Sequence, residues 1–116
     1  MPVEVLASPF NPWQRLADYE ARPEAARGRS GATAVFVGTM RDFNLDDDVT
    51  AMTLEHYPGM TEGYLERIRA EAAERWGLLD SLILHRVGEL APQDPIVLVA
   101  VWSAHRREAF EACRWL

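Results

Sequence analysis

The sequence contains no lysine, and all twelve of its basic residues are arginine. Apart from the amino terminus, the chain therefore offers no primary amine, which excludes Schiff-base chemistry and a lysine nucleophile within these residues. The guanidinium group of arginine instead suits planar, two-point recognition of phosphate or carboxylate. Any anion-binding role of these residues must therefore rest on arginine.

Cysteine is almost as scarce. The single Cys113 excludes an internal disulfide and a multi-cysteine metal site, and its spacing from Ala109 and Phe110 predicts a small core residue rather than a nucleophile. No apolar run approaches the length of a membrane span, and the first residues lack the basic flank and apolar core of a signal peptide. We therefore expect a protein of the reducing cytoplasm, without a membrane partner.

Positive charge is in deficit, because the formal net charge is −6. This balance disfavours nucleic acid as a partner, so a basic function must come from a local cluster of side chains. The hydrophobic fraction of 48% and the charged fraction of 26% are typical of an ordinary globular protein. At 116 residues, the chain is expected to form a single domain, 1–116.

Metal-ligand spacing is also missing. His56 and His85 stand on strand patterns and do not form a short His motif, so a zinc site would need a tertiary coincidence. The acidic run 44–48 with Glu55 has the spacing of a calcium loop, but Val49 occupies the position that needs glycine. We therefore predict no metal site and a solvated acidic loop.

Hydrophobic periodicity predicts alternating strands and helices. Strands are expected at residues 3–6, 32–40, 49–57, 82–87 and 96–102, with residues 41–48 as a loop. Helices are expected after Asn11-Pro12, after a cap at Thr61 and over 107–113, and Gly77 is the expected stop of the second helix. Apolar residues on both faces of 32–40 predict cover from two sides. The order β-α-β-β-α-β-β-α predicts an α+β fold with helices packed on a mainly antiparallel sheet.

The strongest functional signal follows the last predicted strand. The basic residues His105, Arg106 and Arg107 come soon after the apolar run 96–102. Ser103 is the predicted N-cap, which places His105 and Arg106 in a first helical turn, where unpaired N–H groups and the helix dipole favour an anion. Cations are unfavourable there unless an anion answers them, so we expect a phosphate or carboxylate site. A solvated basic turn is the alternative.

A second basic strand end lies at Arg41. If the two strands are neighbours, Arg41 could face one pocket together with His105 and Arg106. Thr39 and Met40 would then line the rim, mainly through backbone atoms. Taken alone, an arginine at a strand end is usually solvated.

The last predicted helix ends on Trp115 and Leu116 with its apolar pattern still running and without a glycine, a proline or a polar tail. Natural helices rarely stop in this way. We therefore expect the domain to be truncated in its last helix, with further residues after Leu116.

Four ordered motifs resemble the large, catalytic subunit of molybdopterin synthase, and together they cover most of residues 31–112. They are FVGTMR (36–41), LEHYPGM (54–60), HRVGEL (85–90) and SAHR with AFEA (103–106 and 109–112). The resemblance implies an α/β hammerhead fold and a homodimer. Each subunit is expected to bind a small ubiquitin-like sulfur carrier with a Gly-Gly thiocarboxylate tail, giving a heterotetramer.

The reaction implied by the resemblance is the conversion of cyclic pyranopterin monophosphate to the dithiolene of molybdopterin, a step of molybdenum cofactor biosynthesis. It uses two sulfur deliveries from the carrier and no further cofactor. Carried across by motif, Thr39, Met40 and Arg41 correspond to the first substrate-binding segment, and His105 and Arg106 to the second. The phosphate and the polar pterin of this substrate suit arginine and a helix N-terminus.

One departure from the family concerns the catalytic residues. The family's catalytic lysines lie on and after the last helix, and this sequence has none up to Leu116. We therefore expect a sulfurtransferase whose lysines lie beyond Leu116, and the catalytic residues within this sequence stay unknown. The alternative is a non-catalytic, truncated relative that acts as a dimerising or carrier-binding module.

Overall fold

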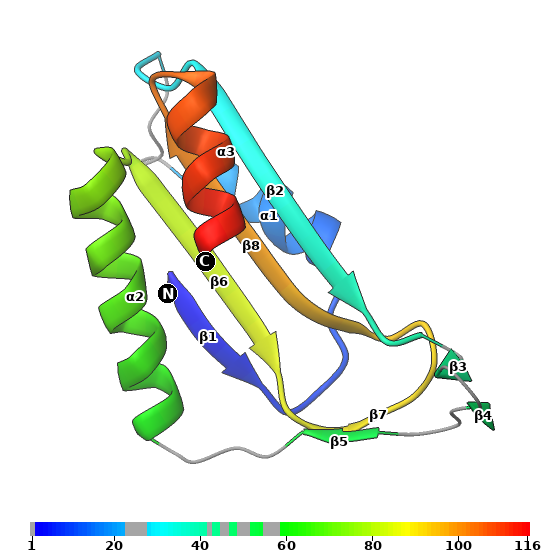
Figure 1. The fold of residues 1–116 in the computed structure, drawn as a ribbon. Coiled ribbons are helices and arrows are strands. Elements are labelled where there is room, and N and C mark those ends of the chain that lie inside the picture. Colours follow the sequence, from blue (N-terminus) through cyan, green and yellow to red (C-terminus); the bar gives the residue numbers. More distant parts are fainter. Residues whose placement is uncertain (1, 23–27, 42, 45–46, 49–51, 55–58) are drawn as a thin grey trace.

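A four-stranded sheet forms the centre of the molecule (Figure 1). In spatial order its strands are β1 (Val3–Leu6), β6 (Asp80–Arg86), β8 (Pro95–Ser103) and β2 (Ala32–Thr39). β1 runs parallel to β6, and the other two neighbouring pairs are antiparallel. The computed structural model describes residues 2–22, 28–41, 43–44, 47–48, 52–54 and 59–116. The predicted α+β fold with a mainly antiparallel sheet is confirmed.

Short strands extend the structure beyond this sheet. β3 (Phe43–Asn44) pairs with β4 (Asp47–Asp48), so the segment expected to be only an acidic loop contains a small antiparallel ladder. β5 (Met52–Leu54) pairs antiparallel with β7 (Gly88–Leu90). The strand expected at 49–57 is therefore confirmed at 52–54, and its other residues lie outside the described ones.

Three helices of the described residues cover the sheet from both sides. α1 (Pro12–Glu20) packs on one face, and α2 (Met60–Trp76) and α3 (Arg106–Trp115) pack on the other (Figure 1). None of these helices combines the length and the apolar character needed to cross a bilayer, a statement limited to the described part of the chain.

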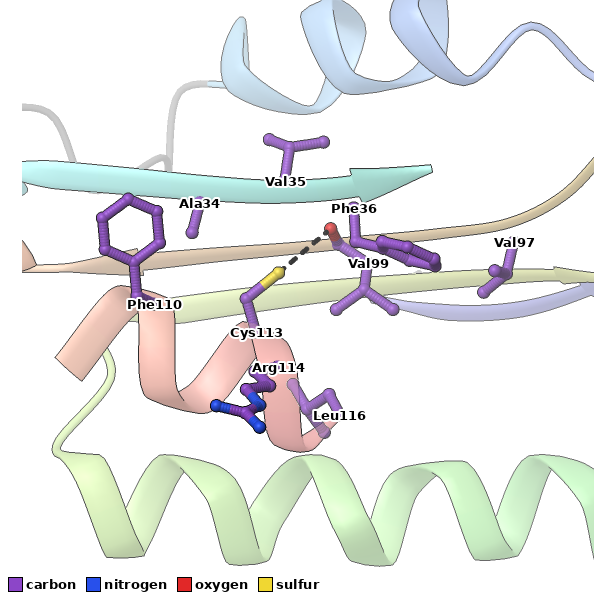
Figure 2. Close-up of a pocket in the computed structure, with 9 residues that line it drawn as sticks. All are labelled: Ala34, Val35, Phe36, Val97, Val99, Phe110, Cys113, Arg114 and Leu116. Atoms are coloured by element: carbon purple, nitrogen blue, oxygen red, sulfur yellow. Dashed lines mark hydrogen bonds between the residues drawn. The ribbon is translucent and has the colours of Figure 1, made fainter. Parts of the chain in front are cut away.

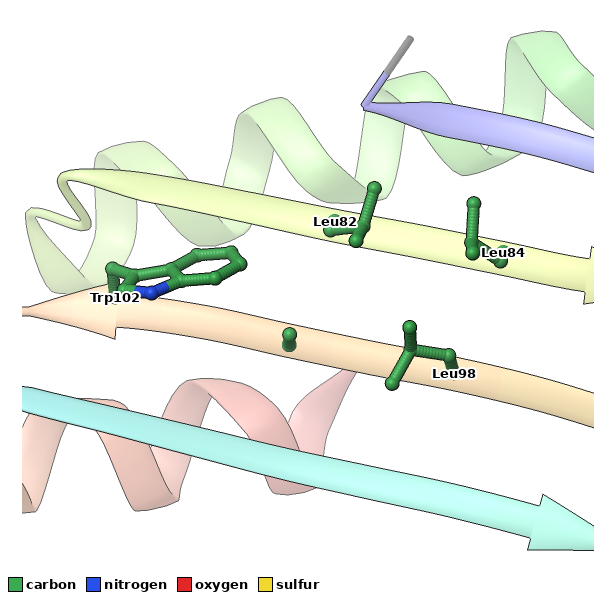
Figure 3. Packing of buried hydrophobic residues seen from close by; sticks show 5 residues of the cluster. Leu82, Leu84, Leu98 and Trp102 are labelled. Atoms are coloured by element: carbon green, nitrogen blue, oxygen red, sulfur yellow. The ribbon is translucent and has the colours of Figure 1, made fainter. Parts of the chain in front are cut away.

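Alternate residues of β6 and β8 form the core under α1. Leu82 and Leu84 of β6 lie beside Leu98 and Trp102 of β8 (Figure 3), and the Tyr19 ring of α1 is 5.4 Å from that of Trp102. Leu84 and Leu98 are 0% exposed. Each buried leucine contributes about 1.5–3 kcal/mol, so this strand pair is the stable centre on which the ends of the sheet are built.

The intervening residues face α2 and α3. Val101 of β8 packs against Ala109 and Ala112, and the small alanine side chains let α3 lie close to the sheet. Ile83 of β6 packs against Leu65 of α2. The apolar face of each helix, repeated about every 3.6 residues, therefore packs on the alternate residues of the strands that face it.

Local sequence signals set several helix ends. Asn11 Oδ1 accepts hydrogen bonds from the Trp13 and Gln14 backbone N–H groups at 3.1 and 3.2 Å, as expected for an N-cap before a proline. Gly77 ends α2 in the left-handed conformation at φ 62°, which confirms the predicted stop. The N-cap of α2 is Gly59 rather than Thr61, so that prediction was wrong by two residues.

The predicted cover of β2 from two sides is confirmed only in part: Ala34 is buried against α3 and Val37 packs on the cluster beneath α1. β2 lies at the edge of the four-stranded sheet, and Val35 and Phe36 are 37% and 54% exposed. α3 packs against β2 as well as against β8, but the edge position still leaves these two side chains exposed, so an apolar pattern that indicates a buried strand here belongs to an edge strand.

Candidate anion-binding site

The turn from Ser103 to Arg106 joins β8 to α3. Ser103 is 2% exposed, and its Oγ accepts a hydrogen bond from the His105 backbone N–H at 3.3 Å. His105 is the N-cap, and Arg106 is the first helical residue. The helix therefore begins later than the predicted cap at Ser103 implied, because the Ser103 hydroxyl closes a local turn before the helix rather than capping its first N–H groups.

Gly31 holds this turn close to the start of β2. The Gly31 backbone N–H donates to the Ser103 carbonyl at 2.9 Å. A Cβ at Gly31 would overlap the Ala104 carbonyl oxygen, a backbone atom that cannot swing aside. The position of the turn is thus fixed by main-chain packing.

The charges around the α3 N-terminus are mixed. His105 and Arg106 are exposed, and Arg107 pairs with Glu111 at 3.2 Å. Arg106 forms no ion pair with a residue that the structure describes. Glu108 also lies in the first turn, and its Oε2 is buried and has no hydrogen-bond partner within the described part of the chain. The sequence interpretation missed this carboxylate, although glutamate near a helix start is a common signal.

The second candidate segment lies at the opposite end of β2. Met40 is 3% exposed, its backbone N–H donates to the Asp94 carbonyl at 2.9 Å, and its own carbonyl accepts from the Gln93 N–H at 2.8 Å. Met40 is therefore an anchor whose backbone groups are already paired. Thr39 and Arg41 on either side of it are exposed.

These two segments do not meet within one chain. β2 starts beside Ser103 and ends beside Pro95, because it runs antiparallel to β8. The strands are neighbours, as the prediction required, but at roughly 3.3 Å per residue the two ends of β2 are about 23 Å apart. The expected single pocket of Arg41 with His105 and Arg106 is therefore not formed inside one protomer.

Two hollows follow α3 along β2. The smaller, of about 130 Å³, is lined by Arg106, Gly31 and neighbouring residues of β2. The larger, of about 500 Å³, runs towards Leu116, and Figure 2 shows Phe110 and Cys113 of α3 facing the sheet there. Both hollows include Ala34 and Phe110, so they form one largely apolar groove.

Thr39 faces a different cavity. Together with Trp13 of α1 and Gln93 it lines a hollow of about 550 Å³ on the α1 side of the sheet. The groove beside α3 lies on the other face. Thr39 and Arg106 of one chain therefore serve separate surfaces.

Cys113 behaves as predicted. It packs beside Ala109 and Ala112, and its thiol donates weakly to the Val99 carbonyl at 3.9 Å. Burial raises the pKa of the Cys113 thiol, which disfavours the nucleophilic thiolate. Cys113 is thus a core residue.

Possible metal ligands are dispersed in the described residues, which contain no group of three or more histidine, cysteine or acidic side chains able to hold an ion. The structure does not describe four residues of the possible calcium or zinc sites, namely Asp46, Val49, Glu55 and His56.

Fold and site together define an α+β domain that carries arginine at both ends of an edge strand and an apolar groove beside its last helix. Among known proteins this architecture has a clear match. The chain belongs to the MoaE protein family, whose family model matches residues 9–116.

Curated relatives and solved structures agree with this assignment. The chain is 55% identical over 92 residues to the molybdopterin synthase catalytic subunit of Ralstonia nicotianae, covering 79% of this chain and 52% of that protein. It is 47% identical over 116 residues to the Pseudomonas aeruginosa subunit of the same name, covering 100% of this chain and 75% of the relative. The chain thus spans between about half and three quarters of the length of these two relatives.

A solved structure shows the same fold. The molybdopterin biosynthesis MoaE protein from Burkholderia ambifaria superposes with a TM-score of 0.81 at 45% identity, covering 97% of this chain and 71% of that one. The family resemblance stated from the motifs is therefore confirmed.

Proposed function

We propose that this chain is the substrate-holding part of a molybdopterin synthase catalytic subunit, which uses sulfur from a small carrier to convert cyclic pyranopterin monophosphate to molybdopterin. Membership of the MoaE family and relatives with this name support the proposal. The observation that carries it is the exposed Arg106 at the start of α3, which forms no ion pair with a described residue, because a guanidinium beside a helix N-terminus suits a phosphate.

The substrate site requires two copies of the chain. Arg41 and Arg106 of one copy are too far apart to hold one small molecule, but a two-fold axis that brings the end of one β2 near the start of the other joins them across an interface. This geometry supports the proposed homodimer. In each site, Arg41 then comes from one copy and His105 with Arg106 from the other.

Each residue has a distinct task in the proposed site. Arg106 and the first N–H groups of α3 hold the phosphate, and Arg41 supplies a second cation for the anion or the pterin carbonyl. Exposed His105 is placed to donate a hydrogen bond or carry a proton, and Thr39 offers a hydroxyl. Met40 anchors its neighbours, since its side chain is buried.

Replacement of Arg106 tests the proposal most directly. In an assay reconstituted with the thiocarboxylated carrier, Arg106→Ala is expected to abolish molybdopterin formation and to weaken pterin binding, while the circular dichroism spectrum stays unchanged. Arg107→Ala is the matched control, because Arg107 is the adjacent arginine and is already paired with Glu111. Unchanged turnover of Arg106→Ala would remove this residue from the site.

Mixing two inactive variants tests the shared site. A dimer of one Arg41→Ala copy and one Arg106→Ala copy carries both substitutions in one site and neither in the other. Random re-pairing is therefore expected to restore about a quarter of the wild-type binding capacity. No recovery after mixing, with dimers shown to exchange, would argue against sites built from two copies.

The lysines implied by the family are proposed to lie outside residues 1–116, because this stretch has none. Reading the coding sequence past Leu116, together with the intact mass of the native protein, tests this. A stop codon there would favour the alternative, a module that dimerises or docks the carrier without catalysis. The expected cytoplasmic location and the heterotetramer remain predictions.

A further inference from the structure

We propose that Arg86 is a positioning residue for the substrate site, because it holds the turn that sets the place of Arg41. The proposal deepens the proposed function and rests on it for its effect on pterin binding. Arg86 carries a buried guanidinium and is not among the residues proposed above to bind the substrate.

Arg86 is a buried charge with few partners. It is 5% exposed at the end of β6. Its Nη2 donates to the Glu89 carbonyl at 2.7 Å, and its Nη1 lies 3.7 Å from Asp94 Oδ2. Its Nε and Nη1 make no hydrogen bond with a residue that the structure describes. A well-packed apolar side chain would often stabilise such a place at least as well.

The partner of Arg86 shapes the turn between β7 and β8. Asp94 Oδ2 accepts a hydrogen bond from the Ala91 N–H at 2.9 Å, and the Asp94 N–H donates to the Ala91 carbonyl at 3.0 Å. Within this turn Gln93 has a φ of 76°, a conformation that favours glycine. The Asp94 carboxylate thus closes a strained turn, and the Arg86 guanidinium lies next to the same carboxylate oxygen.

The same turn grips the end of β2. Gln93 and Asp94 form the two backbone hydrogen bonds to Met40, at 2.8 and 2.9 Å. Arg41 is the next residue, so its Cα follows any movement of Met40. An unbroken series of contacts therefore runs from Arg86 through Asp94 and Met40 to Arg41.

Arg69 of α2 provides a matched control, because it contacts β6 at the end opposite Arg86. Its Nε donates to the Ser81 carbonyl at 3.2 Å, and its Nη2 lies 3.6 Å from Asp80 Oδ1. It therefore makes the same two kinds of contact as Arg86, one to a backbone carbonyl and one to an aspartate. The residues that Arg69 contacts form no hydrogen bond to Met40. Arg69→Met is therefore expected to lower stability as Arg86→Met does, but without moving Arg41.

The experiment compares Arg86→Met with Arg69→Met in the full chain. Amide hydrogen exchange is measured at Met40 and Gln93, and the dissociation constant of cyclic pyranopterin monophosphate is measured by calorimetry. We expect faster exchange at these two amides and a dissociation constant raised about tenfold in Arg86→Met only, since a small misplacement of a binding group weakens binding strongly. Arg86→Lys, which keeps the charge but lacks the planar fork, should lie in between.

Double substitution with Arg41→Ala sharpens the result. If Arg86 acts through Arg41, Arg86→Met has little further effect on binding once Arg41 is removed. Should Arg86→Met prove unstable, Asp94→Asn at the more exposed partner gives the same comparison.

The outcomes separate the two proposals. Unchanged exchange at Met40 and Gln93 in Arg86→Met, or the same exchange in Arg69→Met, overturns the positioning role. Failure of the wild-type chain to bind the pterin overturns the proposed function instead, and the exchange data still decide whether Arg86 holds Met40.

Discussion

The two ends of the β2–β8 ladder are built by different means. At the α3 end the turn is fixed by main-chain packing of Gly31 against Ala104 and by the buried Ser103. At the other end, the turn is held by the side chains of Arg86 and Asp94. The position of the first turn rests on main-chain packing and that of the second on a side-chain ion pair, so we expect the Arg106 side of the site to be rigid and the Arg41 side adjustable.

The largest effect is expected from Gly31→Ala. The added Cβ would overlap the Ala104 carbonyl oxygen, so the start of β2 and the turn must separate. Overpacking of this kind costs about 3 kcal/mol of unfolding free energy, measurable by urea denaturation. Gly63→Ala is the control, because a Cβ there meets nothing within 4 Å and a helix interior favours alanine by about 0.5–1 kcal/mol. Equal stability of the two variants would contradict main-chain locking at the α3 end.

The next effect compares one aspartate near each end. Asp80, opposite Trp102, accepts from the Tyr19 hydroxyl at 3.0 Å and from Arg22 at 2.8 Å. Asp80→Asn is expected to cost about 2 kcal/mol, because it removes the charge from a partly buried network. Asp94→Asn should cost about 1 kcal/mol or less, since this residue is more exposed.

Urea denaturation of both aspartate variants measures this ranking of stability losses. Hydrogen exchange of the Met40 amide should rank the two variants in the opposite order. Only Asp94→Asn is expected to change the Met40 amide. A reversed order of stabilities would mean that charge matters more at the turn end than its exposure indicates.

The pH dependence of stability isolates the network around Asp80. Burial, and then the hydrogen bond to Asp80, raises the pKa of Tyr19 from 10.0 to about 12. The folded state therefore holds this proton more tightly than the unfolded chain does. Its stabilising effect is complete below pH 10 and is lost as the pH rises towards about 12. Tyr19→Phe should flatten this loss of stability in urea denaturation measured as a function of pH.

The smallest effect is expected at Gln93. Gln93→Gly relieves a positive φ and should stabilise the turn by about 0.5–1 kcal/mol, offset in part by the greater freedom of the unfolded chain. Thermal unfolding measures the net change. A clear loss of stability would show that the Gln93 side chain, which lines the cavity with Trp13 and Thr39, matters more than its backbone strain.

Local features of the fold could be predicted because their causes are local. The Asn11-Pro12 start of α1, the Gly77 stop of α2 and the apolar strands β6 and β8 follow from rules that act over a few residues. The N-cap of α3 was misplaced at Ser103 instead of His105, because the Ser103 hydroxyl accepts a hydrogen bond in a turn before the helix. The predicted cover of β2 was only partly right, because apolar residues on both faces of a strand do not distinguish an edge strand from a central one.

The sequence indicated candidate residues for the site but not how they are arranged. Arg41 and Arg106 stand at strand and helix ends as expected, but their separation depends on the direction of β2 relative to β8. Arg86 belongs to the motif HRVGEL (85–90), but its role could not be predicted, because an arginine at the end of a strand pattern is ordinarily solvated. Only packing makes it a buried charge next to Asp94.

The sequence by itself determined the family, the order of the three helices and the longer strands, and the restriction of any anion site to arginine and histidine side chains, since motifs, periodicity and the absence of lysine can be read directly from it. The tertiary structure alone decided which groups lie together. Strand direction, edge position and burial arise from contacts between residues distant in sequence. These contacts placed the two arginines at opposite ends of one ladder and linked Arg86, through Asp94, to the backbone of Met40.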